Sequence, residues 1–567
     1  MKVALVFPPS WTPTMPHLAL PTLAGCLREN GIEVELLDLN LEFLEAILCP
    51  QGLSAAADML QERRALPQFL REQVVAEGEA LSAKISRAKA VVCGEAFFTV
   101  EEGLAALNLI LQALAFVSSA YEGVYLELSG YVPALPLESS AALRAQLADG
   151  RRNPFLAVSR ERFVPRLLRL GPDLVGISVV CLCQLLPALT LARLLRQAGY
   201  EGHITLGGPH VTMLREELPQ LDWLWELVDS LVIGEGEEPL LRLVEALAGR
   251  GSLGAVPGLV RRANGRVAIS PLSAPARRWP MPDFRGLPLR QYLVPRLVLP
   301  IAGSRGCYHG RCAFCNVGYG LAAPYRALPP EEIAAQMQEL ARRHGTRYFF
   351  FADEVISPQL LEGLARELRG GPFSWVGCAR LEPALTEGLL RALAEAGCRM
   401  LLFGLESGCA RTLRRMRKGI ELSVASRILR QSAAAGIWNH IFFFFGFPGE
   451  GLAEAQETVN FLYEHADCIH SAAFGSFLLE RHAPAHRDPA RFGIRKMWAE
   501  DSCDLAISLR YEAEHGLTEK DAGELAERFL GALPDRPAGH LYLHDTYRFL
   551  YACSLQEQGL PYPLWLQ

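Results

Sequence analysis

Three cysteines within nine residues form the densest group of reactive side chains in the sequence. They lie in the segment Cys307-Tyr-His-Gly-Arg-Cys312-Ala-Phe-Cys315. Thiolates bind metals, and three of them suit a [4Fe–4S] cluster that keeps one iron open for a substrate or cofactor. The chain has fourteen cysteines in total, and the others are scattered. In a reducing compartment such scattered cysteines are mostly small buried hydrophobic residues.

Zinc and a disulfide are the alternatives for this loop. Zinc needs a fourth ligand, and His309 lies within the same loop, where its spacing would strain a shared tetrahedral site. A disulfide would leave one cysteine unpaired, and disulfide frameworks belong to short secreted chains. We therefore interpret the three cysteines as ligands of an iron–sulfur cluster.

Charged side chains end several of the apolar segments that follow the loop. Asp353 and Glu354 follow the second segment of the series. Arg380 ends the third segment, and Glu406 ends the fourth. The carboxyl ends of barrel strands meet at the mouth where barrel enzymes carry out chemistry. Acidic residues also begin ordinary helices. On residue type alone, each acid could therefore serve the chemistry at the barrel mouth or simply start a helix.

The elements that would position these residues are six strand–helix units. Six units predict a partial (β/α)6 barrel of the TIM type, short of the eight units of a closed barrel. The run 441–445 within it reads as a core strand. The predicted strands are 297–303, 348–352, 374–380, 399–404, 440–446 and 471–477, separated by helices at about 329–343, 358–369, 383–396, 421–435 and 452–465.

A second strand–helix series occupies the N-terminal part of the chain. It predicts an α/β, doubly wound, Rossmann-like domain over residues 1–270, with a mainly helical insertion at about 41–165. Asn264-Gly265 predicts a hairpin that closes this domain. The predicted strands are 2–7, 33–39, 173–180, 203–208 and 230–235, with helices at 17–30, 184–198 and 237–248.

The remaining boundaries follow from proline content and periodicity. Residues 271–290 are proline-rich and predict a linker. We place the barrel at 291–485 and a C-terminal, mainly helical segment at 486–567, which is irregular before a helix start at Thr518.

Glycines and small residues end the strands of the N-terminal sheet, where doubly wound folds bind ligands. Each such strand end is weak on its own, because glycine often only makes a turn. Glycine also lets a backbone approach a ligand closely, since it lacks Cβ. The residues concerned are Ser178, Val180, Gly207, Gly208, Gly234 and Glu235.

Composition excludes several classes of protein. The 567 residues carry a formal net charge of −6 with no block of basic residues, which argues against a dedicated nucleic-acid binder. The longest apolar stretches, 103–117 and 441–447, are shorter than the roughly 18–20 residues of a membrane span. We expect a cytoplasmic protein with neither nucleic acid nor membrane as a partner.

The cysteine loop, with Phe314 directly before its third cysteine, resembles the signature of radical S-adenosylmethionine (radical SAM) enzymes. Those enzymes have a partial (β/α)6 barrel, which agrees with the strand count. The usual spacing is Cys-x3-Cys-x2-Cys, whereas this chain has four residues in the first gap. Relatives with a Cys-Tyr-(aromatic)-Gly-Arg-Cys-x-Phe-Cys loop tolerate the extra residue.

The resemblance also implies roles for the strand-end residues. Asp353 and Glu354 would hold the methionine amino group of S-adenosylmethionine. Arg380 would pair with the methionine carboxylate or tune the cluster. The segment Gly404-Leu-Glu406-Ser407-Gly408 looks like the GxES segment of the family, so Glu406 and Ser407 would bind the ribose or the amino-acid end. The turn 446–450 would shape the adenine site through its backbone.

The N-terminal strand ends, placed before such a barrel, resemble a cobalamin (B12)-binding domain. The resemblance implies that Ser178 contacts the nucleotide tail and that Gly207 and Gly208 let the backbone approach it. The Asp-x-His-x-x-Gly motif that supplies an axial histidine is absent from the sequence, so we expect cobalt without a protein ligand below it. His210 is then a loop residue, and we expect core roles for the neighbouring Cys181 and Cys183.

Together these resemblances imply three cofactors: a [4Fe–4S] cluster, S-adenosylmethionine and cobalamin. They suggest a radical SAM methyltransferase that acts on an unactivated carbon, similar to the branch that matures ribosomally made peptides. The substrate would be a peptide or natural product, and an external donor such as flavodoxin or ferredoxin would supply electrons. A non-methylating rearrangement or cyclisation and a cobalamin-binding sensor are the alternatives. A hydrogen-atom donor role for Cys503 or Tyr511 stays open.

Overall fold

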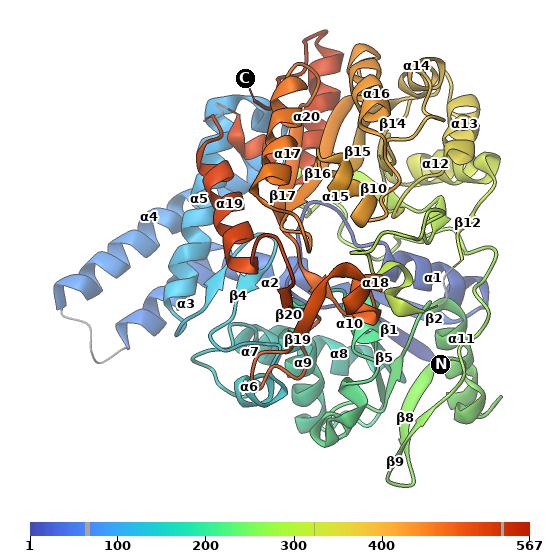
Figure 1. The fold of residues 1–567 in the computed structure, drawn as a ribbon. Coiled ribbons are helices and arrows are strands. Elements are labelled where there is room, and N and C mark those ends of the chain that lie inside the picture. Colours follow the sequence, from blue (N-terminus) through green and yellow to red (C-terminus); the bar gives the residue numbers. More distant parts are fainter. Residues whose placement is uncertain (63–67, 322–323, 535–537, 567) are drawn as a thin grey trace. The chain divides into compact units, whose positions relative to one another are not determined.

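The computed structural model describes residues 1–62, 68–321, 324–534 and 538–566 (Figure 1). It divides into two compact units. The first comprises Met1–Leu297 together with Asp501–Ala506, and the second comprises Val298–Glu500 together with Ile507–Gln567. Each unit has its own sheet, mainly parallel in the first and wholly parallel in the second, and its own hydrophobic core.

The first unit is built on a seven-stranded sheet in the order β2-β1-β5-β6-β7-β8-β9. The first five strands in this order pair in parallel, which confirms the predicted doubly wound sheet. The chain leaves β1 in one direction and returns on its other side as β5, so the strand order reverses between them. Doubly wound sheets bind ligands at such a switch point. The strands are β1 (Lys2–Phe7), β2 (Glu33–Asp38), β5 (Leu174–Ser178), β6 (His203–Gly207), β7 (Ser230–Val232), β8 (Leu259–Ala263) and β9 (Arg266–Ile269).

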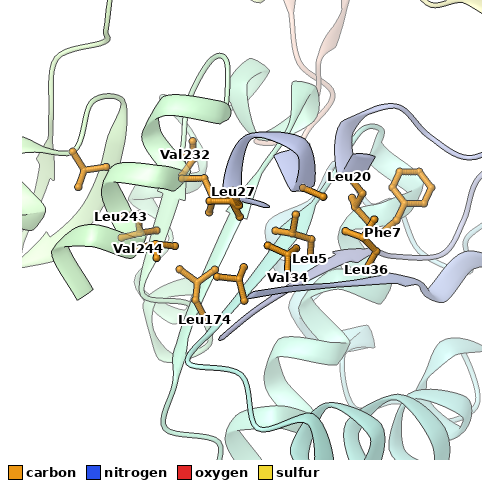
Figure 2. Packing of buried hydrophobic residues seen from close by; sticks show 14 of the residues in the cluster. Leu5, Phe7, Leu20, Leu27, Val34, Leu36, Leu174, Val232, Leu243 and Val244 are labelled. Carbon is orange, nitrogen blue, oxygen red and sulfur yellow. The ribbon is translucent and has the colours of Figure 1, made fainter. Parts of the chain in front are cut away.

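Helices α1 (Ala19–Glu29) and α11 (Glu237–Leu247) cover one face of this sheet. Their apolar stripes meet alternate residues of the strands, because side chains on a strand alternate between faces. Figure 2 shows the resulting core, in which Leu5 and Leu174 from the sheet face Leu27 and Leu243 from the two helices. Burying one such side chain contributes roughly 1.5–3 kcal/mol.

The hairpin that ends this sheet is present as predicted. Strands β8 and β9 pair antiparallel. Asn264 and Gly265 both have positive φ, 51° and 75°, as a two-residue turn matching the twist of the strands requires.

The insertion between β2 and β5 is mainly helical, as predicted, and adds a two-residue hairpin, β3 (Tyr125–Leu126) with β4 (Tyr131–Val132). Helix α5 is long and apolar enough to cross a membrane by length and composition, yet 44% of its apolar window is buried. It packs against α3 and α4 as a core helix of the insertion. The helices are α2 (Leu39–Ile47), α3 (Pro50–Gln61), α4 (Gln68–Val92), α5 (Val100–Ser119), α6 (Ser140–Gln146), α7 (Phe155–Val158) and α8 (Val164–Leu170).

The second unit contains a six-stranded parallel sheet in the order β10-β13-β14-β15-β16-β17 (Figure 1). This confirms the predicted partial (β/α)6 barrel, with β10 and β17 as its edges. The strands are β10 (Val298–Ile301), β13 (Tyr348–Phe351), β14 (Ser374–Ala379), β15 (Cys398–Glu406), β16 (Trp438–Phe445) and β17 (Ser471–Ser476). The helices between them are α12 (Pro330–His344), α13 (Pro358–Glu367), α14 (Glu387–Glu395), α15 (Ala410–Arg415), α16 (Leu422–Ala434) and α17 (Leu452–Glu464).

Strand β16 shows which face of the sheet is covered by which helices. Asn439 donates a hydrogen bond to the Leu429 carbonyl of α16 at 2.7 Å, so odd-numbered residues face the outer helices. Trp438 instead contacts Tyr551 of the C-terminal helix α20 (Asp545–Glu557). Even-numbered residues therefore face the inner side of the barrel, and Phe444 lies on that side near the strand's carboxyl end.

The C-terminal part begins with a small sheet that the sequence did not predict. Strands β18 (Leu479–Glu480), β20 (Ser508–Ala513) and β19 (Ile494–Trp498) pair antiparallel. Strands β19 and β20 lie in the segment expected to be irregular, and β18 lies at the end of the range predicted for the barrel. Helix α19 (Glu519–Gly531) then starts at Thr518 with a capping box to Asp521, as predicted. The expected helical character is thus confirmed for α19 and α20.

Candidate functional site

The cysteine loop, residues 306–316, is anchored at both ends and in its middle. Strands β11 (Ser304–Arg305) and β12 (Arg326–Ala327) pair antiparallel and close the base of the excursion that contains it. The Ala313 amide donates to the Met416 carbonyl at 2.8 Å, and the Ala313 carbonyl accepts from the Ala485 amide at 2.9 Å. Ala313 is fully buried in a core that includes residues of β18, β19 and β20. The unpredicted C-terminal sheet therefore supports the loop.

All three loop thiols are half-buried and free. Burial raises the pKa of Cys312, while Lys418 and Arg380 act to lower it. Burial also raises the pKa of Cys315 to about 12, and the neighbouring Cys312 adds to that shift. Iron binding requires thiolates, so the two cations favour the ligand form. Within the described ranges, no three His, Cys, Asp or Glu side chains stand close enough together to hold a single metal ion.

The two acids after β13 have different surroundings. Asp353 is buried and accepts hydrogen bonds from the Gly303 amide, at 3.0 Å, and from the Ser304 hydroxyl. Burial raises its pKa to about 6. Glu354 is exposed, and its charge acts on Cys315. Asp353 therefore fastens the chain that follows β10, and Glu354 is the carboxylate whose charge acts on the cysteine loop.

Glu406 forms a buried ion pair that the sequence did not predict. The Lys418 ammonium donates to Glu406 Oε1 at 2.8 Å, and both side chains are about nine-tenths buried. Glu406 has a φ of 68°, an uncommon backbone conformation for a residue other than glycine. A Cβ on Gly404 would lie 2.4 Å from Glu406 Oε1 and 2.7 Å from Lys418 Nζ. The glycine of the Gly-x-Glu segment therefore makes room for the ion pair.

Arg380 lies at the end of β14 within a polar network. Its Nη2 donates to the Lys418 carbonyl, and its buried Nε has no hydrogen-bond partner among the described residues. Glu382 Oε2 lies 3.7 Å from that Nε. The hydroxyl of Tyr308, next to Cys307, donates to the other oxygen of Glu382 at 2.6 Å. The unsatisfied Nε leaves a buried donor for an anionic ligand.

Two predicted segments are occupied by structural hydrogen bonds. The Ser407 side chain is fully buried, accepts from the Cys409 amide at 3.1 Å and contacts the Thr458 hydroxyl at 3.1 Å. In the turn 446–450, buried Glu450 accepts from the Gly446 amide. Tyr511 donates its hydroxyl to the Gly446 carbonyl at 3.0 Å. These side chains hold the turns in shape, and ligand contact by Ser407 stays a prediction.

Phe314 lies against the inner end of β16. Its ring packs edge-on to Phe444 with centroids 5.2 Å apart, and Lys418 Nζ lies 5.8 Å from the Phe314 centroid. Phe444 was expected to be a core residue only, yet it is half-buried. Alternation along β16 is the signal that would have placed it on the inner face.

The carboxyl edge of the first sheet is built differently. Ser178 is buried at the end of β5, in register with Gly207. The fully buried Gln184 accepts from the Val180 amide at 2.8 Å and donates to the Pro8 carbonyl at 2.9 Å. Gln184 thereby ties together the chain after β1 and after β5, the two strands of the switch point. Sequence reasoning missed this residue, because one glutamine carries no pattern.

The two neighbouring glycines after β6 differ in their surroundings. Gly208 has a φ of 105°, and a Cβ there would lie 2.4 Å from the Val179 carbonyl oxygen. A Cβ on Gly207 would meet its nearest atoms, of Val232, at an ordinary 3.6 Å. The fold itself therefore requires glycine at Gly208 but not at Gly207. A requirement at Gly207 would have to come from a ligand.

The other predicted residues of this edge lie in the adjoining turns. Gly234 has a φ of 85°, and its amide donates to the Thr212 hydroxyl at 3.1 Å. Glu235 is half-buried in the turn between β7 and α11. His210 is not a loop residue as expected, because it is buried in the short helix α10 (Pro209–Met213). Burial lowers its pKa to about 4.

Cys181 and Cys183 are half-buried at this edge and not core residues as expected. Their thiols interact with one another, which lowers the pKa of Cys183 to about 7 and raises that of Cys181. Cys181 Sγ also lies 3.9 Å from the Ser10 carbonyl, and Cys183 Sγ lies 3.7 Å from the Tyr131 carbonyl. Cys503, raised above as a hydrogen donor, lies in the segment Asp501–Ala506 that groups with this unit.

Two protein families match this chain. Residues 140–244 match the B12 binding domain. Residues 301–462 match the radical SAM superfamily. The chain thus carries a region similar to a B12-binding domain, followed by a region similar to a radical SAM domain. These domains imply a [4Fe–4S] cluster, S-adenosylmethionine and cobalamin as cofactors, as the sequence predicted.

The curated relatives include methyltransferases and cyclases. An uncharacterized methyltransferase of Pyrococcus horikoshii is 27% identical over 305 residues, covering 52% of this chain and 64% of the relative. The cytidylyl-2-hydroxyethylphosphonate methyltransferase of Streptomyces wedmorensis is 25% identical over 397 residues, covering 61% and 72%. The anaerobic magnesium-protoporphyrin IX monomethyl ester cyclase of a Synechocystis strain is 28% identical over 222 residues, covering 36% and 43%. The chain thus spans slightly under two thirds of the first of these relatives.

Solved structures share the fold. The cobalamin-dependent S-adenosylmethionine radical enzyme OxsB with aqua-cobalamin bound superposes with a TM-score of 0.61 at 16% identity, covering 94% of this chain and 67% of that one. The radical S-adenosylmethionine methyltransferase TsrM from Kitasatospora setae gives a TM-score of 0.54 at 16% identity, covering 86% and 75%. At this identity the likeness concerns the fold alone.

The residues present fit the implied cofactors. Three thiols on one anchored loop are the donor set of a [4Fe–4S] cluster with an open iron. The unsatisfied Arg380 Nε and the exposed Glu354 offer a donor and an acceptor for an amino acid. At the carboxyl edge of the first unit's sheet, a Cβ on Gly207 would meet its nearest atoms at an ordinary 3.6 Å, so the fold itself does not require glycine there.

Proposed function

We propose that this protein is a cobalamin-dependent radical SAM methyltransferase that methylates an unactivated carbon. The observation that carries the proposal is the presence in one chain of an anchored three-cysteine loop surrounded by Glu354, Arg380 and Glu406 and of a B12-type sheet edge at Gly207. The names of curated relatives support methyl transfer. A peptide or natural product is the substrate class that the resemblance of the cysteine loop favours.

The residues of the barrel mouth would divide the work of binding. Cys307, Cys312 and Cys315 would hold the cluster. Glu354 would accept hydrogen bonds from the methionine amino group, and Arg380 Nε would donate to the carboxylate. When bound, the cofactors supply radical cleavage of a C–H bond and a methyl group carried on cobalt, while the protein orients and shields them.

Glu406 would contribute through the oxygen that Lys418 does not occupy. Lys418 binds Oε1, which holds the carboxylate in one orientation and leaves Oε2 to accept from ribose hydroxyls. A fixed acceptor loses less conformational entropy on binding than a mobile one. The buried ion pair is therefore a positioning element for the cofactor.

Product analysis tests the proposal. Methylation of an unactivated carbon should consume two molecules of S-adenosylmethionine in each turnover. One gives 5′-deoxyadenosine, and the other gives S-adenosylhomocysteine when cobalt is remethylated. Candidate substrates should be incubated with the reconstituted holoenzyme under anaerobic conditions, and both co-products and the product mass measured. We expect near-equal amounts of the co-products and a product heavier by one methylene unit.

A radical rearrangement or cyclisation is the second candidate, favoured by the similarity to anaerobic cyclases. It predicts 5′-deoxyadenosine alone, with a product of unchanged carbon count. A cobalamin-binding sensor would not need the cysteine loop. The anchoring of this loop and the acids near it therefore argue against a sensor. The ultraviolet–visible spectrum of anaerobically purified protein separates the sensor from both enzymes, because cluster and cobalamin absorb differently.

A further inference from the structure

A groove of about 620 Å3 runs beside the cysteine loop in the second unit. One wall is formed by loop residues between Cys307 and Cys312, among them His309 and Arg311. Arg414 and Arg417, from the end of α15 and the turn after it, line the other wall. Nothing in the proposed chemistry at the strand ends uses these arginines.

The groove concentrates positive charge that the protein leaves unbalanced. Arg311, Arg414 and Arg417 have no ion-pair partner within the described part of the chain. Neighbouring arginines differ, since Arg411 pairs with Glu454 at 2.9 Å and Arg415 donates to the Pro448 carbonyl at 3.1 Å. The whole chain has a net charge of −6, so this basic groove is a local feature.

The groove is firmly connected to the cysteine loop. His309 Nε2 lies 2.8 Å from the Arg417 carbonyl, which joins the two walls. The Arg417 guanidinium stacks over Phe492 at 4.9 Å, and Phe492 belongs to the core that buries Ala313. A protein seated in the groove would therefore contact Arg311, which directly precedes Cys312, and His309, which lies two residues after Cys307.

We propose that this groove docks an acidic one-electron carrier protein. The inference rests on the proposed function, because a cluster that cleaves S-adenosylmethionine must first be reduced. In each encounter the reduced carrier gives up one electron to the cluster and is itself oxidised by one electron. Opposite charges on the two surfaces raise the rate of encounter and fix orientation. A phosphate-bearing substrate is disfavoured as the occupant, because the groove is lined by loop residues between Cys307 and Cys312. Glu354 and Glu406, which mark the proposed reaction site, do not line it.

The test uses the double variant Arg311→Glu/Arg414→Glu of the full chain. Arg250→Glu is the matched control, because Arg250 is exposed and lies in the first unit. The first readout is the Kd of oxidised flavodoxin, measured by calorimetry at low and high salt. The second is the rate of 5′-deoxyadenosine formation, driven either by reduced flavodoxin or by titanium(III) citrate, which needs no docking surface.

We expect the double variant to bind flavodoxin at least about tenfold more weakly and to lose the carrier-driven rate in proportion. Its titanium-driven rate should stay within about twofold of the wild type. Salt should weaken wild-type binding and affect the variant less, because exposed charges are screened. Arg250→Glu should behave as the wild type in every assay.

Three results would overturn the inference. One is wild-type affinity for flavodoxin in the double variant. Another is an equal loss of both rates with a raised KM for the substrate, which would assign the groove to substrate binding. The third is an equal loss of flavodoxin affinity and of the carrier-driven rate in Arg250→Glu, which would show that only the net charge of the protein matters. A wild-type enzyme that forms no 5′-deoxyadenosine with titanium(III) would contradict the proposed function, while the Kd comparison would still test the groove.

Discussion

The two cofactor regions of this protein are built from different kinds of chemical group. At the barrel mouth, charged side chains gather around the cysteine loop, and a buried Glu406–Lys418 pair lies among them. At the edge of the B12-type sheet, the features are backbone groups, glycines and the amide of Gln184, which bonds to two main-chain atoms. The barrel mouth offers charged side chains to a ligand, whereas the sheet edge offers backbone groups and the space beside its glycines.

This difference predicts different sensitivities to substitution. A site made of functional groups fails when one group is exchanged, even if the fold survives. A site made of backbone and small residues fails when volume is added or when the backbone conformation changes. Substitutions chosen in matched pairs therefore test the contrast directly.

The largest effect is expected from the cluster cysteines. Changing Cys307, Cys312 or Cys315 to Ala should abolish the four-iron cluster, because each change removes one of the three thiolates on the loop. Iron and sulfide should be measured after anaerobic reconstitution. Cys468→Ala, at a buried thiol bonded to the His465 carbonyl, is the control and should keep full iron. Retention of a complete cluster in all three loop variants would contradict the assignment.

The ion pair at the barrel mouth should have the next largest effect. Glu406→Ala leaves Lys418 buried without a counter-charge, which costs about 3–5 kcal/mol. Both 5′-deoxyadenosine and S-adenosylhomocysteine should fall together, because one cofactor site is weakened. In the double variant Glu406→Ala/Lys418→Met, the free energy of unfolding should recover while both co-products stay low. Loss of a single co-product would show that Glu406 does not serve a shared site.

The two glycines of the B12-type edge should separate folding from ligand binding. Gly208→Ala places a Cβ against the Val179 carbonyl at positive φ, which should lower the free energy of unfolding by about 1–3 kcal/mol. Gly207→Ala should leave folding unchanged, yet weaken cobalamin binding if the nucleotide tail approaches there. Thermal unfolding and cobalamin titration measure the two effects. Unchanged cobalamin affinity in Gly207→Ala would move the tail away from this residue.

The smallest effect concerns pH. The pKa of His210 is lowered to about 4 by burial, so the unfolded chain takes up a proton near pH 6.5 that the folded chain refuses. Stability contributed by neutral His210 is therefore present above about pH 6.5 and is lost as pH falls, by about 1 kcal/mol at pH 5.5. His210→Gln should flatten this dependence in urea unfolding, and the exposed His515→Gln should not. An unchanged slope in His210→Gln would contradict a buried neutral imidazole.

Much of the architecture was predictable because hydrophobic periodicity is a local property. Strand β15 of the barrel, for example, has nine residues and lies between Gly397 and Ser407, which the sequence displays directly. The small sheet of β18, β19 and β20 was not predicted. Its strands have two to six residues, and β19 does not alternate regularly between buried and exposed positions. Pairing across distant segments leaves little local signal.

The cysteine loop and the strand-end acids could be found from residue type and spacing, because parallel strands bring their carboxyl ends to one edge. The division of labour between Asp353 and Glu354 could not be found this way. Both are acids at the same strand end, and only packing buried Asp353 as a partner of Ser304 and left Glu354 exposed. The only sign in the sequence that Lys418 has a special role, as the partner of Glu406, is that the chain has just six lysines.

The sequence by itself predicted the three-cysteine loop as the ligand set, and it determined the six strand–helix units and the doubly wound N-terminal sheet. Each depends on residue identity or on spacing along the chain. Both can be read from the sequence without knowing which distant residues lie nearby in the fold. Tertiary structure alone decided which polar groups are occupied, such as Ser407 and Glu450, and which are available, such as Arg380 Nε. It also decided that Gly208 serves the fold while Gly207 has space beside it. Whether a group is free depends on atoms brought from elsewhere in the chain, and only folding places those atoms.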